Sequence, residues 1–99
     1  MFTIDIQEGM LEKLRSMLED EDEGACVRLR EYKMGGGCHS HIILGLSFEE
    51  MDDDEDEKIV MDGIPFIAER DFLLKYGRSF SLGFNEDRQV TLTPVSTEK

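Results

Sequence analysis

Three consecutive glycines, Gly35–Gly37, separate two stretches that each alternate apolar and polar residues, and this arrangement predicts a β-hairpin. In the first stretch, residues 25–33, Val27 and Leu29 share one face, which we expect to be buried. The second stretch, residues 41–48, has three apolar residues on a single face: Leu44, Leu46 and Phe48. We therefore expect two paired strands joined by a glycine loop.

A thiol and two imidazoles follow the glycines directly, as Cys38, His39 and His41. Cysteine and histidine bind borderline and soft metals, so these three residues are the candidate metal ligands. Along an extended strand His39 and His41 point to one side and Cys38 to the other, so joint ligation requires the glycine loop to bend the chain. The other cysteine, Cys26, lies toward the far end of the first strand, roughly 20 Å away at about 3.3 Å per residue. One protomer cannot join both thiols to one metal, and we interpret Cys26 as structural.

The length and net charge of the chain limit the kinds of protein it can be. Its 99 residues predict one domain over residues 1–94, with residues 95–99 as a flexible tail. Two cysteines cannot build a disulfide framework, and we see no secretory leader or apolar run of about 20 residues, so a cytoplasmic location is expected. A formal net charge of −12 disfavours nucleic acid and membrane surfaces as partners and favours a basic protein or a cationic ligand.

Two further stretches repeat apolar residues at helical spacing. The first, over residues 6–19, begins beside Asp5 and Glu8, which have the spacing of a capping box. The second, over residues 66–76, follows Pro65, a residue favoured at the start of helices. We expect a helix over each range.

The rest of the chain predicts short strands. Residues 58–61 read as a strand that ends in a turn at Asp62-Gly63, and residues 79–84 and 89–93 as a closing hairpin. The order of helix, hairpin, acidic segment, strand, helix and hairpin predicts an α+β fold with mainly antiparallel or mixed sheets and two helices.

Residues 49–57 hold eight carboxylates in nine positions. Such a block repels itself, and we expect it to stay extended and solvated. Calcium is a conceivable ligand, but the segment lacks the alternating aspartates, the glycine and the closing glutamate of an EF-hand loop.

Four segments in this order resemble the HesB/IscA-like A-type carriers of iron–sulfur cluster assembly: Val27-Arg28-Leu29, Gly36-Gly37-Cys38, Ile59-Val60-Met61-Asp62 and Arg70-Asp71-Phe72. The similarity covers most of residues 1–94. It implies a HesB-like domain in which Cys38 supplies a ligand to iron or to a cluster. The family's C-terminal Cys-Gly-Cys has no counterpart in residues 85–99, and His39 with His41 are the candidate auxiliary ligands. Together with Cys38 from two protomers they would provide the four ligands that a cluster needs, so the resemblance favours a homodimer.

The sequence therefore leads to two functional hypotheses of different kinds. The first is a carrier, not an enzyme, that binds iron or an iron–sulfur cluster through Cys38 and exchanges it with a donor or recipient protein. The alternative is a metal-free adaptor with the same fold that binds a basic partner through its acidic surface. A zinc site shared between protomers and a thiol hydrolase with Cys38 as nucleophile are further alternatives, the latter without a third catalytic residue to support it.

Overall fold

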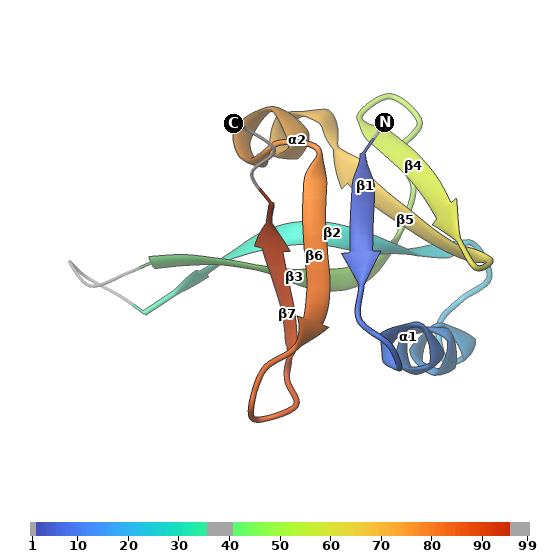
Figure 1. The fold of residues 1–99 in the computed structure, drawn as a ribbon. Coiled ribbons are helices and arrows are strands. Elements are labelled where there is room, and N and C mark those ends of the chain that lie inside the picture. The colour runs from blue at the N-terminus through green and yellow to red at the C-terminus, as the bar shows by residue number, and fades with distance from the viewer. Residues whose placement is uncertain (1, 36–40, 96–99) are drawn as a thin grey trace.

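The computed structural model describes residues 2–35 and 41–95 (Figure 1). Within those ranges it contains seven strands and two helices: β1 (Thr3–Ile6), α1 (Met10–Glu19), β2 (Ala25–Met34), β3 (His41–Glu50), β4 (Asp56–Met61), β5 (Ile64–Glu69), α2 (Arg70–Tyr76), β6 (Ser79–Phe84) and β7 (Val90–Pro94). Neither helix in this part of the chain has the length and apolar character needed to cross a membrane.

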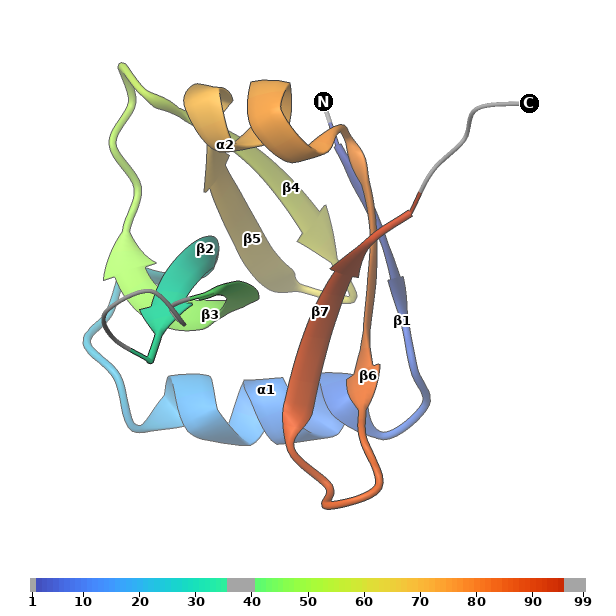
Figure 2. The ribbon, with the colours of Figure 1, turned by 90° about the vertical axis from the view of Figure 1, so that its left-hand side faces the viewer.

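The strands form two sheets, so the predicted α+β class with mixed sheets is confirmed. A four-stranded sheet has the order β3-β2-β5-β4, and a three-stranded sheet has the order β1-β6-β7. Most neighbours are antiparallel, but β2 pairs with β5 and β1 pairs with β6 in parallel. The helices lie at opposite ends of the two sheets, with α1 across one end and α2 at the other (Figure 2).

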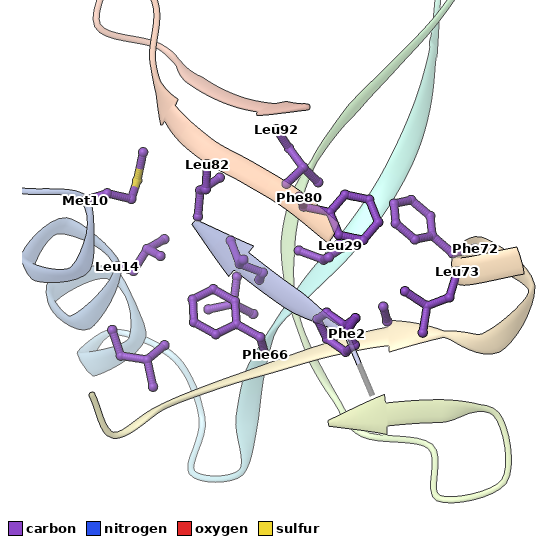
Figure 3. Close-up of a cluster of buried hydrophobic side chains, with 14 residues drawn as sticks. Phe2, Met10, Leu14, Leu29, Phe66, Phe72, Leu73, Phe80, Leu82 and Leu92 are labelled. Carbon is purple, nitrogen blue, oxygen red and sulfur yellow. The ribbon is translucent and has the colours of Figure 1, made fainter. Parts of the chain in front are cut away.

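The hydrophobic core fills the space between the two sheets and α1 (Figure 3). Phe66 of β5 and Phe80 of β6 are fully buried within it, and Met10 and Leu14 of α1 cover one end. At the other end the ring of Phe72 from α2 stacks on that of Phe80, with the centroids 5.5 Å apart. Both helices are therefore held by apolar packing, α1 against strands from distant parts of the chain and α2 against the strands next to it in sequence.

The first helix begins later than the expected residue 6. Residues 3–6 form β1, and the helix starts at Met10, after Gly9 in the left-handed region at φ +89°. Gly9 occupies the N-cap position and no side chain caps the helix, so the predicted capping box of Asp5 and Glu8 is wrong. The apolar residues at positions 4 and 6 suit a strand as well as a helix, and pairing with β6 decides for the strand.

The second helix also begins later than expected, at Arg70 in place of residue 66. Residues 64–69 form β5, which lies between β2 and β4. Phe66, Ile67 and Ala68 are all fully buried, so this strand is covered on both faces and shows no alternation. A short apolar run of this kind cannot be told from a helix by periodicity.

The predicted hairpins and turns are confirmed with small changes of length. The strand expected over residues 25–33 reaches Met34, and its partner reaches Glu50. Asp62 and Gly63 form the β4–β5 turn with positive φ values of 50° and 81°. The closing hairpin joins residues 79–84 to residues 90–94. Of the expected tail, residues 96–99 lie outside the described residues.

Candidate functional site

The β2–β3 hairpin is the scaffold of the candidate metal site. Its strands pair over ten consecutive positions, from Ala25 with Glu50 to Met34 with His41. The near half packs on the body through Val27 and Leu29, both buried as predicted. The far end, residues 32–35 and 41–43, is called the arm here. Figure 1 shows the arm extending away from the rest of the molecule.

Of the three predicted ligands, the structure describes His41 alone. Cys38 and His39 lie outside the described residues. His41 is the first residue of β3 and is exposed, and it pairs with Met34, the last residue of β2. Within residues 2–35 and 41–95, no three histidine, cysteine or acidic side chains lie close enough together to hold a metal ion.

The hairpin has its own internal packing at the start of the arm. The ring of Tyr32 lies against Gly45 on the neighbouring strand, where an added Cβ would be 2.9 Å from the ring carbon Cε2. The hydroxyl of Tyr32 donates a hydrogen bond of 2.8 Å to the carbonyl of Leu46. An aromatic ring over a glycine protects the backbone that the glycine leaves open. Two apolar residues of the arm, Ile42 and Ile43, remain 51% and 43% exposed.

Cys26 is buried, with only 4% of its surface exposed. Its Sγ lies 3.7 Å from the carbonyl oxygen of Gly24, a weak hydrogen bond. Burial raises the pKa of this thiol, since the charged thiolate is disfavoured away from water. A buried, protonated thiol is a poor metal ligand and a poor nucleophile, which agrees with a structural role.

Sequence reasoning missed a buried ion pair beside the hairpin. Arg28 lies on the face of β2 opposite the core, and its guanidinium binds both carboxylate oxygens of Asp56. Its Nε also lies 2.9 Å from Oε1 of Glu49. Asp56 belongs to the acidic block that was expected to be extended and solvated, and for this residue the expectation is wrong, because its side chain is completely buried. An arginine between two core residues, Val27 and Leu29, is the signal that could have indicated a buried acidic partner.

Hydrogen bonds keep the carboxylates of this network ionised. Burial acts to raise the pKa of Asp56, but hydrogen bonds from Arg28 and from the backbone N–H of Asp52, together with the charge of Arg28, lower it overall. The pKa of Glu49 is lowered mainly by a hydrogen bond from the hydroxyl of Ser47, with help from Arg30. The network therefore stays charged at neutral pH and fixes the end of β3 to the start of β4.

A cleft of about 690 Å³ lies between β2, the segment after β3 and α2. It is lined by Arg28, Leu29, Arg30, Glu31, Glu49, Glu50 and Glu69 from the strands, by Asp52 from the segment after β3, and by Asp71, Phe72, Lys75 and Tyr76 from α2. Lys75 and Tyr76 both bind the carboxylate of Glu31, so α2 is linked to β2 across the cleft. The sequence showed the acidic residues of this region, but it gave no indication of a cleft.

The chain matches no protein-family model, and no curated protein is similar to it.

Proposed function

We propose that the chain is a divergent HesB/IscA-like protein that binds iron or an iron–sulfur cluster through Cys38 and acts as a carrier in cluster assembly or delivery. The observation that supports this best is the ten-pair β2–β3 hairpin. Its last pair, Met34 and His41, brackets the Gly36-Gly37-Cys38 segment that carries the resemblance.

A carrier has to receive and release its cargo, so its ligands have to be within reach of another protein. The arm extends from the body, and the His41 side chain at its end is exposed. The buried Cys26 cannot contribute. One protomer then offers at most Cys38, His39 and His41, and a cluster with four protein ligands calls for a second copy of the chain. The proposal assumes a reduced, cytoplasmic setting, in which Cys38 remains a thiol.

The test is the iron, zinc and acid-labile sulfide content of protein purified without oxygen. Cys38→Ala is compared with the wild type and with Cys26→Ala, a control that removes the buried thiol. We expect iron with sulfide in the wild type and in Cys26→Ala, and loss of both from Cys38→Ala. Equal iron and sulfide in all three proteins would contradict the role of Cys38, and so would their absence from the wild type. Zinc without sulfide would indicate a structural or regulatory zinc site instead.

The second candidate function is a metal-free adaptor that binds a basic partner protein. It is favoured by the carboxylates that stay exposed after Asp56 is buried, at residues 50 and 52–55, beside the cleft. Attraction between exposed charges weakens as salt is added, because the Debye length falls to about 3 Å at 1 M. Partner capture that persists unchanged in 1 M salt would contradict this candidate.

A further inference from the structure

The edge of β2 that faces the cleft has no strand beside it over most of its length. β5 pairs with β2 at Val27 and Arg28 only, and then turns into α2 at Arg70. From Leu29 to Met34, β2 pairs with β3 on one side, and no strand in the described part of the chain pairs with its other side. A strand edge of this kind presents unpaired N–H and C=O groups that can bind another extended chain.

The cleft reaches this edge. Its lining includes four consecutive residues of β2, Arg28–Glu31. Since successive strand residues point to opposite faces, a cleft lined by all four has to extend along the backbone between them. Phe72 and Tyr76 form an aromatic part of the opposite wall. Such rings pack well against the alkyl stems and cationic heads of lysine and arginine.

The charge of the cleft selects the ligand. Six carboxylates line it against three cationic side chains, and all three cations are already engaged: Arg28 with Asp56 and Glu49, Arg30 with Glu49, and Lys75 with Glu31. Among the described residues no cationic side chain pairs with Glu50, Glu69 or Asp71. These carboxylates do not converge on one point as metal ligands would. They suit charges that are spaced along a chain.

We infer that the cleft between β2 and α2 binds an extended, lysine- or arginine-rich segment of a partner protein, which pairs with the free edge of β2 and places its basic side chains against Glu50, Glu69 and Asp71. The inference rests on the second proposed function, the adaptor, and assigns its binding site and mode. It is independent of any metal bound through Cys38.

The test measures the fluorescence anisotropy of a labelled peptide, Lys-Val-Lys-Val-Lys-Val-Lys, at low ionic strength. The cleft variant is Glu50→Gln with Glu69→Gln. One control is Glu8→Gln with Glu12→Gln, at the start of α1, and another is Asp53→Asn with Glu55→Gln, in the acidic block outside the cleft lining. Each pair removes the same formal charge. We expect the cleft variant to bind about tenfold more weakly, as for two ordinary exposed ion pairs, and both controls to stay within about twofold of the wild type.

A second peptide carries N-methyl groups on alternate residues, which remove the backbone donors needed for strand pairing. Loss of its binding supports pairing with β2, and unchanged binding overturns it. If all three variants bound the peptide equally weakly, the peptide would be attracted by the overall charge of the protein, and the cleft would not be its binding site. If only Asp53→Asn with Glu55→Gln lost peptide binding, the adaptor function would still be supported, but its binding site would be the acidic block and not the cleft. No binding by the wild type would overturn the inference, and Cys38→Ala is expected to bind normally in every case.

Discussion

Arg28 and Asp56, which lie 28 positions apart in the chain, form two parallel hydrogen bonds, Nη1 to Oδ1 and Nη2 to Oδ2, each 2.7 Å long. The two residues come from β2 and from the start of β4, which are not neighbours in the sheet. The pair therefore connects the hairpin that carries Cys38 to the strand on the other edge of the same sheet.

Removal of one partner from this pair should destabilise the fold strongly. Asp56→Asn leaves the charge of Arg28 buried without its main counter-ion, and we expect a loss of roughly 3–5 kcal/mol in the free energy of unfolding, measured by urea denaturation. Asp53→Asn, an exposed change in the same acidic block, should stay within about 0.5 kcal/mol of the wild type. Replacement of both partners, Arg28→Met with Asp56→Leu, should cost less than Asp56→Asn alone. A larger cost for the double variant would show that the charges themselves are required.

The same pair predicts a dependence of stability on pH. The pKa of Asp56 is lower in the folded protein than the value of about 3.9 expected in the unfolded chain, so its contribution is complete above pH 4. It is lost as the pH falls below 4 and through the folded pKa. The difference in unfolding free energy between the wild type and Asp56→Asn should therefore shrink from pH 5 to pH 2. A difference that stays constant over this range would contradict ionisation of Asp56 as the cause.

Cys26 should be unreactive in the folded protein. Its burial and its raised pKa both reduce the thiolate available for alkylation. In Cys38→Ala, where Cys26 is the remaining thiol, iodoacetamide at pH 8 should leave the native protein unlabelled and modify it fully in 8 M urea, as judged by mass. Rapid labelling without urea would show that Cys26 is accessible, and Cys26 would then have to be considered as a metal ligand.

The contact between Tyr32 and Gly45 should make the arm sensitive to one methyl group. Gly45→Ala forces the Tyr32 ring away from its hydrogen bond to Leu46, and we expect a loss of roughly 1–3 kcal/mol in unfolding free energy. In a Tyr32→Ala background the same substitution should cost much less, since the clash is gone. A double-mutant cycle by urea denaturation gives the coupling. Additive effects would mean that the ring and the glycine are not in contact.

The link between α2 and β2 can be followed through one phenol. The hydroxyl of Tyr76 donates to Glu31, and this hydrogen bond raises the pKa of Tyr76, because the carboxylate favours the protonated phenol. In Tyr32→Phe, where Tyr76 is the remaining tyrosine, absorbance at 295 nm should therefore titrate above the usual value of about 10. Addition of Glu31→Gln should lower the midpoint. An unchanged midpoint would show that α2 does not hold Tyr76 against β2 in solution.

The hairpin was predictable because its signal is local. Val27 and Leu29 alternate with polar residues, and the period of two is visible without knowledge of any partner strand. The beginnings of both helices were not predictable in this way. Residues 3–6 become a strand because β6 lies beside them, and residues 64–69 because β2 and β4 do. In both cases strand pairing with a distant segment, β6 or β2, overrode local periodicity.

At the candidate site, too, local features could be predicted from the sequence, whereas contacts between distant segments could not. The residue types at positions 38, 39 and 41 are evident in the sequence, and His41 lies at the end of a strand as expected. Asp56 was indistinguishable from the seven other carboxylates of its block, since only the fold brings it to Arg28. The cleft was hidden because it depends on where β5 separates from β2.

The pairing of β1 with β6 affects when the first strand becomes buried as the chain is synthesised. Thr3 and Ser79 are register partners although they lie 76 positions apart. Contacts over such distances form slowly, because the loop between them has to close first. During synthesis, Phe2 and Ile4 are made long before residues 79–82, and β1 has no strand beside it until that segment emerges. β1 therefore stays unprotected while most of the described chain is made, and any product that stops before β6 exposes these two side chains to chaperones and proteases.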